Sequence, residues 1–283
     1  MEFTTLTDQV HIKDVSKKGF NESWIKTNKP VIIKGLLDQT PASKWDLNFL
    51  EKEIGHFKVN VFDSQHKNRT AYLRGDHFVS MKHMLHLIRE NKPSDLRMFV
   101  NPILSKNKKL AKDIPCPDFF TCRFQLPNLM FLGGKETVVP LHYDFMYDDG
   151  LLLQLFGRKE IILVEPKQAH LLYRIPFNST STINLFQVDV SDYPALKKLK
   201  AYRVTLDHGD TIFIPSGYWH QMIYTDASLS IGFRKWNRNP FVTFKTGVIR
   251  LTQIPFDKSL SLIFGKYWFN WKVNHSKRFE KSH

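Results

Sequence analysis

The stretch of sequence that decides the fold is Val139-Pro140-Leu141-His142-Tyr143-Asp144, together with a second segment that ends at His220. That second segment is Gly209-Asp210-Thr211-Ile212-Phe213-Ile214-Pro215-Ser216-Gly217-Tyr218-Trp219-His220, an apolar run between two turn signals. On a strand, residues i and i+2 point to the same face and lie about 6–7 Å apart along it. The sequence therefore predicts His142 and Asp144 on one face of a strand, with His220 delivered by a turn after another.

Two histidines and one carboxylate on a rigid β-scaffold form a facial triad. Such a triad leaves coordination positions open on a metal and is typical of non-heme Fe(II) oxygenases. A short His/Asp pair alone also fits two solvated surface residues. The turn residues and the Trp-His pair around His220 favour a metal site instead, with His142, Asp144 and His220 as its catalytic ligands.

Three motifs follow one another in this region: Val139–Asp144, Gln154-Leu155-Phe156-Gly157-Arg158-Lys159 and Glu165-Pro166. They resemble the core of the cupin-type JmjC family of Fe(II)- and 2-oxoglutarate-dependent hydroxylases. The resemblance is strongest over about residues 128–236 and extends loosely to Lys29–Gly35 and Trp45. This family includes the asparaginyl hydroxylase that inhibits the hypoxia-inducible factor. Over Pro166–Tyr173, Tyr193, Pro194 and Lys197, the chain is also similar to the tRNA wybutosine hydroxylase branch.

The resemblance implies an Fe(II) centre at the triad and assigns the distal carboxylate of the cosubstrate, 2-oxoglutarate, to Lys159. Arg158 is expected to face the other side of the strand, because successive side chains alternate. By the same alternation, Tyr143 is expected to face away from the metal. The resemblance also implies three apolar residues along the cosubstrate pocket, although core packing explains them equally well. These are Leu129, Phe131 and Leu152.

Three positions depart from the asparaginyl hydroxylase pattern near the metal. Val139 replaces a threonine, and Gly150 and Gly232 each replace an asparagine. The polar residues nearby that are available to take over their contacts are Asp148, Gln154 and Arg234. These departures imply a different handling of substrate and O2, because the triad and Lys159 are intact.

The chain carries a large excess of positive charge. Its 283 residues include 41 Lys and Arg against 27 Asp and Glu, which gives a net charge of +14 and a pI near 9.6. A basic surface attracts nucleic acid and acidic proteins, but a solvated surface explains the charge as well. The dense groups are Lys106, Lys108, Lys109 and Lys112; Lys197, Lys198, Lys200 and Arg203; and Lys272, Lys277, Arg278 and Lys281.

Short apolar runs separated by turn signals predict a mainly β fold. With the resemblance, we expect a double-stranded β-helix, the cupin or jelly-roll core, with helical additions at both termini. One domain over residues 1–283 divides into an α/β flank (1–96), the core (97–239) and a helical tail (240–283). In the flank, helical spacing runs from Trp45 to Ile54. Ser80 caps a further helix, on which His83 and His86 are expected to face solvent or to pack, without binding a metal.

The remaining signals concern compartment. No apolar run approaches the ~18–20 residues that span a bilayer, and the polar start lacks the blocks of a signal peptide. Cys116 and Cys122 match neither a redox motif nor a zinc spacing. We expect free thiols, no membrane association, and a cytoplasmic protein or, in a eukaryote, a nuclear one.

Two functions stay open. The first is an Fe(II)- and 2-oxoglutarate-dependent oxygenase that hydroxylates a protein side chain or a tRNA nucleoside. The second is a non-catalytic cupin that binds a metal or ligand and serves as an interaction module. The presence of both Asp144 and Lys159 favours the enzyme.

Residues 241–283 are rich in apolar and aromatic side chains, among them Leu260, Ile263, Phe264, Trp268 and Trp271. A helix or two cannot bury them on all sides. They either cover one end of the barrel or pair across a two-fold axis. The resemblance favours a homodimer through residues 241–283, because C-terminal helices form the dimer of the asparaginyl hydroxylase.

Overall fold

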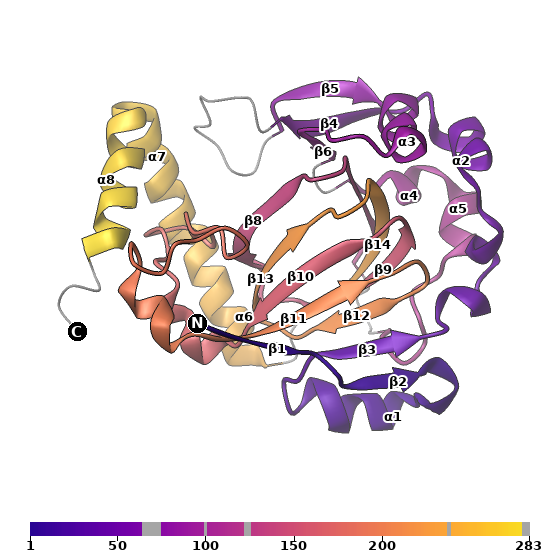
Figure 1. The fold of residues 1–283 in the computed structure, drawn as a ribbon, viewed down its shortest axis with the longest axis horizontal. Coiled ribbons are helices and arrows are strands. Elements are labelled where there is room, and N and C mark those ends of the chain that lie inside the picture. Colours follow the sequence, from indigo (N-terminus) through magenta and orange to yellow (C-terminus); the bar gives the residue numbers. More distant parts are fainter. Residues whose placement is uncertain (64–74, 99–100, 122–125, 237–238, 279–283) are drawn as a thin grey trace.

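Two β-sheets that pack face to face form the centre of the molecule, and helices extend from both ends (Figure 1). The computed structural model describes residues 1–63, 75–98, 101–121, 126–236 and 239–278. The strand order is β1-β11-β10-β13-β8 in the first sheet and β2-β3-β12-β9-β14-β7-β6-β4-β5 in the second. The predicted mainly β core with helical additions is confirmed. The boundary predicted at residue 97 falls inside β6.

The strands of the first sheet are β1 (Glu2–Thr5), β8 (Val138–Tyr143), β10 (Lys159–Val164), β11 (Lys200–Leu206) and β13 (Trp219–Ile223). Those of the second sheet are β2 (Gln9–His11), β3 (Val31–Lys34), β4 (Lys58–Asp63), β5 (His77–Ser80), β6 (Leu96–Met98), β7 (Leu129–Gly133), β9 (Asp149–Phe156), β12 (Thr211–Ile214) and β14 (Ser228–Lys235).

The α-helices are α1 (Lys17–Phe20), α2 (Leu47–Ile54), α3 (Met81–Glu90), α4 (Ile103–Lys106), α5 (Lys108–Asp113), α6 (Pro240–Val248), α7 (Ile254–Phe264) and α8 (Lys266–Arg278). The 3₁₀ segments are Ile12–Asp14, Leu37–Gln39, Pro41–Lys44, Pro166–Leu171 and Pro194–Lys198, and the π-helical turns are Asn21–Ile25 and Ile249–Gln253.

Strand β10 shows how the alternation of side chains builds the core. Ile161 and Leu163 point into the space between the sheets, where they pack with Ile212 of β12. Ile162 and Val164 point to the opposite face and pack under the loops that follow β10. Because both faces of β10 are covered, the strand is apolar at nearly every position rather than at every second one.

A third apolar cluster joins the second sheet to the N-terminal helices, with Leu50 and Met84 packed on the same core as Leu153. The Ser80 hydroxyl accepts a hydrogen bond from the backbone N–H of His83, so the predicted cap of α3 is present. Of the two alternatives for His83 and His86, the structure shows the first, because both side chains are exposed. The predicted helical start at Trp45 is wrong: Asp46 caps α2 through the N–H of Phe49, and Trp45 is extended.

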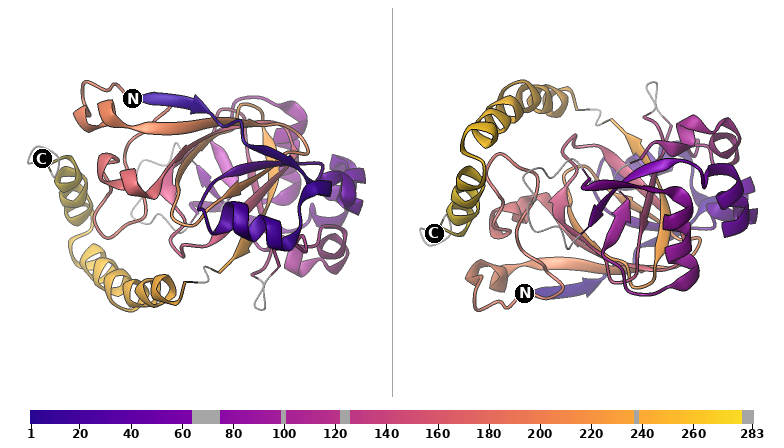
Figure 2. Two further views of the ribbon diagram at one scale, coloured as in Figure 1. Left: turned by 90° about the horizontal axis from the view of Figure 1, so that it is seen from below. Right: turned by 90° about the horizontal axis from the view of Figure 1, so that it is seen from above.

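The C-terminal helices α6, α7 and α8 form an arc that stands beside the barrel rather than over its centre (Figure 2). Phe177, in the loop after β10, contacts this arc, with ring centroids 5.7 Å from Phe256 and 6.0 Å from Trp268. Its backbone is left-handed, with φ of 62°. Within the arc, Asp257 accepts hydrogen bonds from Trp268 and from the buried Lys272. Lys272 therefore adds little to an exposed basic face, and Lys281 lies outside the described residues.

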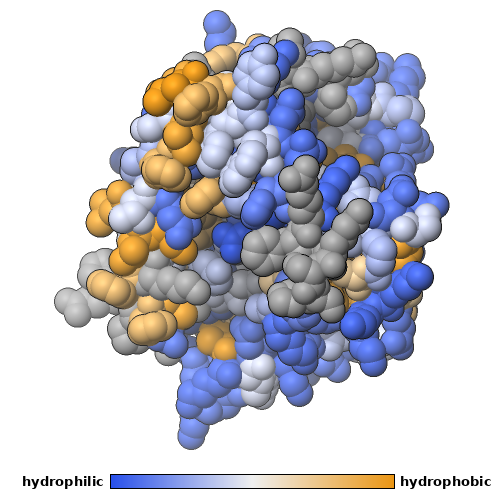
Figure 3. Space-filling model, turned by 90° about the vertical axis from the view of Figure 1, so that its left-hand side faces the viewer, coloured by the Kyte–Doolittle hydropathy of each residue, from blue (hydrophilic) through white to orange (hydrophobic). Residues whose placement is uncertain are grey.

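The arc exposes many apolar side chains. Ile263 is 71% exposed and Leu262 is 78% exposed. Figure 3 shows apolar side chains gathered over one side of the face that these helices form. Further exposed members are Phe241, Phe244, Leu251, Phe256, Phe264, Tyr267 and Trp271. Contiguous apolar surface of this kind marks an interaction site more often than a solvated one.

The homodimer predicted from the sequence remains a prediction, and the arc supplies its test. We expect the full chain to be dimeric, and Ile263→Asp to shift it toward monomer because a charge would be buried in the interface. Light scattering at micromolar concentration measures the mass. Lys266→Asp, an exposed neighbour, is the matched control. A monomeric wild-type chain would contradict the prediction, whereas equal masses for wild type and Ile263→Asp would place the interface elsewhere.

No helix within the described residues is long and apolar enough to cross a membrane. Cys116 is half-buried, and Cys122 lies outside the described residues.

Candidate metal centre

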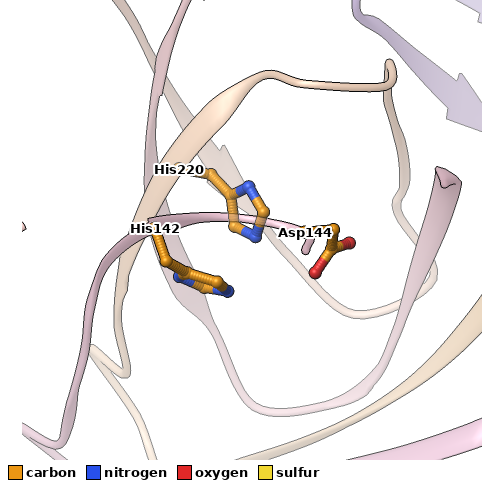
Figure 4. A group of neighbouring side chains, drawn as sticks. All are labelled: His142, Asp144 and His220. Carbon is orange, nitrogen blue, oxygen red and sulfur yellow. The ribbon is translucent and has the colours of Figure 1, made fainter. Parts of the chain in front are cut away.

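The two histidines of the predicted triad lie directly opposite each other on neighbouring strands. His142 of β8 pairs with His220 of β13 in the antiparallel ladder, and their ring centroids are 4.2 Å apart. Asp144 follows β8 immediately and turns its carboxylate toward both rings (Figure 4). One ligand atom from each of the three residues lies within 4.8 Å of the other two. The predicted facial triad is therefore assembled.

A hydrogen bond fixes the orientation of each imidazole. Nδ1 of His142 lies 2.8 Å from the carbonyl oxygen of Pro140, and Nδ1 of His220 lies 3.1 Å from that of Tyr218. A carbonyl oxygen only accepts, so each Nδ1 must carry the proton and donate it. Nε2 is left with its lone pair on both rings. A backbone acceptor on the far nitrogen is a common support for a metal-binding histidine.

A shift in strand pairing leaves the carbonyl of Pro140 free for the histidine. The pairing of β8 with β13 shifts between His220 and Met222, so that Pro140 and Leu141 lie opposite Gln221 alone. Proline has no N–H to donate to the ladder, and bulges of this kind re-aim side chains beside active sites.

The triad has the protonation states that a divalent cation requires. Burial lowers the pKa of His142 to about 3, and the charge of His220 acts in the same direction. Burial likewise lowers the pKa of His220. For Asp144, burial raises the pKa, but the positive charge of Arg234, with smaller contributions from His220 and His142 in their protonated forms, outweighs it and holds the pKa below its usual value. Neutral imidazoles beside a charged carboxylate are the ligand forms for a metal at neutral pH.

Arg234 of β14 holds the carboxylate in place. Its Nη2 donates to Oδ1 of Asp144 at 3.0 Å, and its Nη1 lies 3.9 Å from Oδ2 of Asp148. The bond to Oδ1 leaves Oδ2 of Asp144 for a metal. Arg234 thus links the ligand to a second, buried acid.

A cavity of about 360 Å³ opens beside the triad, a size typical of small-ligand sites. Lys159, the first residue of β10, lines it and is only 1% exposed. Its Nζ lies 4.3 Å from the centre of the Tyr224 ring, and within the described part of the chain no carboxylate pairs with it. Burial lowers the pKa of Lys159 to about 7. A buried lysine that faces a cavity without an acid is arranged to receive an anion.

The turn before Lys159 depends on Gly157. Its φ is 68°, and a Cβ at this position would lie 2.3 Å from the carbonyl oxygen of Ala227. Only glycine fits both conditions. Arg158, the intervening residue, pairs with Asp207 on the surface and faces away from the cavity, as the alternation predicted.

The geometry agrees with the comparison with known families. The model of the family described as cupin-like domain matches residues 17–243. The chain belongs to this family. Its relatives also confirm the predicted membership of the cupin-type JmjC proteins.

Individual relatives of this cupin-like protein are distant. Human tRNA wybutosine-synthesizing protein 5 is 24% identical over 241 residues, which cover 78% of this chain and 75% of the relative. Jumonji C domain-containing protein 5 of Drosophila melanogaster is 28% identical, with 77% of this chain and 57% of the relative covered. Lysine-specific demethylase JMJ30 of Arabidopsis thaliana is 29% identical, with 77% and 52% covered. These relatives support a JmjC-type oxygenase.

Only some of the other predicted site residues of this cupin-like protein line the cavity. Phe131, Leu152 and Arg234 line the cavity, whereas Leu129 and Gln154 are not among its lining residues. Gln154 is buried, donates to the carbonyl of Phe156 and accepts from the Ser230 hydroxyl. Its amide therefore supports the barrel and does not replace a contact at the metal.

Val139, Gly150 and Gly232 all line the cavity. The two glycines differ in the space that surrounds them. A Cβ on Gly232 would lie 2.6 Å from the ring of Phe131, so this ring fills the space of a side chain. A Cβ on Gly150 would meet its nearest neighbour at an ordinary 3.8 Å, so side-chain room is left there. At Gly232 the ring of Phe131 therefore takes the place of a polar side chain, whereas at Gly150 the absence of a side chain leaves the cavity wider.

Tyr143 packs against Trp219 and Tyr147, with ring centroids at 5.0 and 5.1 Å, although part of it also borders the cavity. Sequence reasoning missed several lining residues because they lie outside the recognisable motifs. They are Phe62, Arg97, Met98, Phe145, Met146, Asn178, Ser179, Thr180, Met222 and Tyr224. Among them, Arg97 is the residue that the sequence could have indicated, because it is a charged residue within the short strand Leu96–Met98.

Proposed function

We propose that this cupin-like protein is an Fe(II)- and 2-oxoglutarate-dependent oxygenase that hydroxylates a protein side chain or a tRNA nucleoside. The observation that carries the proposal is the joint presence, in one cavity, of the triad and the buried Lys159. The donor set fits the metal, because two neutral imidazole nitrogens and a carboxylate oxygen converge with other coordination positions open. A non-catalytic cupin has no need for a buried cation beside such a centre.

When bound, the metal supplies the oxidising chemistry, in which O2 and 2-oxoglutarate yield succinate and CO2 and one oxygen atom enters a substrate C–H bond. The chain's own residues bind and orient. Lys159 donates to the distal carboxylate of the cosubstrate, and Arg234 holds Asp144 as a ligand through one oxygen. The walls formed by Phe131 and Leu152 keep water from the reacting atoms.

Between the two substrate classes, the observations favour a nucleoside in tRNA. The net charge of +14 supports binding to a polyanion. The tRNA wybutosine-synthesizing relative is covered over 75% of its length, compared with 52% for the demethylase. A protein substrate is the other outcome of the experiment below.

The test is succinate formation by protein reconstituted with Fe(II), supplied with 2-oxoglutarate and O2. We expect tRNA to stimulate succinate formation and to gain one oxygen atom by mass spectrometry, and the stimulation to weaken steeply with salt. Stimulation by a protein extract but not by tRNA would assign the other substrate class. Succinate formation that is no faster than with metal-free protein under all conditions would contradict the oxygenase itself.

A further inference from the structure

A second cavity lies beside helix α1, outside the metal centre, and we call it the α1 cavity. Its volume is about 350 Å³, and no described residue lines both cavities. Arg234 faces the metal cavity, and successive side chains of a strand alternate, so Lys235 faces the other side of the second sheet. The described residues that line the α1 cavity are Lys17, Lys18, Asn21, Phe119 and Lys235.

Lys235 is a buried cation in an aromatic environment. Its side chain is only 1% exposed, and its Nζ lies 5.4 Å from the centre of the Phe120 ring. Phe233, on the same face of β14, belongs to the same apolar cluster as Phe120. Asp149, its partner across strands, accepts the backbone N–H of Ser216 and is not among the cavity's lining residues. An ammonium that loses its hydration in such surroundings gains from any anion that reaches it.

The turn at residues 117–121 brings a second ammonium to the same place. Nζ of Lys17 donates to the hydroxyl of Thr121 at 3.1 Å. The residue before Thr121 is Phe120, over which the ammonium of Lys235 lies. Consecutive Cα atoms are only about 3.8 Å apart. The two ammonium groups therefore lie against neighbouring residues of one turn, although one lysine comes from α1 and the other from β14.

Helix α1 contributes the rest of the polar lining. Phe20 fixes the helix on the second sheet, with its ring centroid 4.7 Å from that of Phe119 and 5.0 Å from that of Phe213. Lys18 adds a third positive charge to the α1 cavity, and Asn21 adds a side-chain amide. Among the described residues that line this cavity, none is acidic.

We propose that the α1 cavity binds a phosphate group, either as free phosphate or as part of an RNA backbone. Three ammonium groups offer only donors, and a phosphate presents several acceptor oxygens to them. Lysine binds phosphate as a compact point charge and needs no planar fork. The burial of Lys235 strengthens its attraction for an anion, because little water screens the charge. This site uses neither the metal nor 2-oxoglutarate, and it goes beyond the proposed function.

The test is calorimetry of inorganic phosphate with the metal-free full chain, at an ionic strength held constant with chloride. We expect saturable binding with one site per chain. Lys235→Met should weaken it roughly 10- to 150-fold, the range for a lost charge-assisted hydrogen bond. Lys17→Gln/Lys18→Gln should weaken it as well. The matched control, Lys29→Gln, removes an exposed lysine outside the cavity and should change nothing.

Two further comparisons locate the site and identify the source of the phosphate. Lys159→Met should bind inorganic phosphate as wild type does, because Lys159 lines the other cavity. With a uridine oligonucleotide as the probe, a weakened affinity of Lys17→Gln/Lys18→Gln assigns the site to an RNA backbone. An unchanged oligonucleotide affinity, with a weakened phosphate affinity, assigns it to free phosphate.

Thermal unfolding identifies a variant that has lost its fold, and if Lys235→Met does so, Lys17→Gln/Lys18→Gln provides the result. A wild-type chain without saturable phosphate binding overturns the proposal. So does phosphate binding that the α1 cavity variants retain in full and that Lys159→Met loses. Neither outcome bears on the oxygenase, which succinate formation tests separately.

Discussion

Asp144→Ala is expected to remove high-affinity metal binding and all turnover of 2-oxoglutarate. Loss of a residue that merely supports a ligand typically costs ~10–100-fold in metal affinity, so loss of a ligand should exceed ~100-fold. Two neutral histidines alone are a poor site for a hard divalent cation. Calorimetry with Mn(II) measures the affinity, and succinate formation measures the turnover.

The structure also indicates that the fold survives this change. Asp144 lies after the end of β8 rather than in an apolar cluster, and Arg234 retains Asp148 as a neighbour. Circular dichroism and thermal unfolding should therefore stay close to wild type. His170→Ala, which removes an exposed histidine, is the control for histidine or acid loss in general. Wild-type succinate formation by Asp144→Ala would reject the triad.

Lys159→Met is expected to weaken 2-oxoglutarate about 10- to 150-fold and to leave Mn(II) affinity little changed. Methionine keeps much of the stem volume but loses a charge-assisted hydrogen bond, which is typically worth ~1.5–3 kcal/mol. Calorimetry of both ligands separates the two effects. An unaltered 2-oxoglutarate affinity would leave the carboxylate to another residue that lines the cavity.

The pH dependence distinguishes Lys159 further. Because burial lowers its pKa to about 7, the free protein loses the ammonium as the pH rises through about 7. The anion binds the charged form, so wild-type affinity should decline above pH 7, and binding at pH 8 should take up a proton. Lys159→Met should show neither effect. A proton uptake at pH 8 that is equal in both proteins would assign the titration to another group.

The metal ligands were predictable from the sequence because each depends on local backbone. His142 and Asp144 are set by two-residue spacing, and His220 by a strand framed by turns. Lys159 was predicted differently, from its match to the family lysine in the motif Gln154–Lys159, and Gly157 sets the turn just before it. The sequence also indicated the mainly β fold, because strands covered on both faces, such as β10, are nearly continuous apolar runs.

Other parts of the site depend on pairing between distant strands, which no local pattern encodes. Arg97 lines the cavity because β6 is placed beside β7, where Arg97 pairs with Gly133. Leu129 does not line the cavity, although Phe131, two residues along the same strand, does. The packing partner of the C-terminal apolar residues could not be predicted either, because a helical pattern does not indicate which surface the helix packs against.

The contact of Phe177 with the C-terminal helices has a consequence for the order in which the molecule matures. A left-handed backbone at a residue other than glycine costs on the order of 1–3 kcal/mol, and it persists only where surrounding packing holds it. The next three residues, Asn178, Ser179 and Thr180, form part of the cavity wall, and the carbonyl of Ser179 accepts the N–H of Tyr143. During synthesis the barrel strands leave the ribosome well before α7 and α8. The metal ligands can therefore assemble first, while the wall beside them takes its final shape only after the helices near the end of the chain have been made and packed.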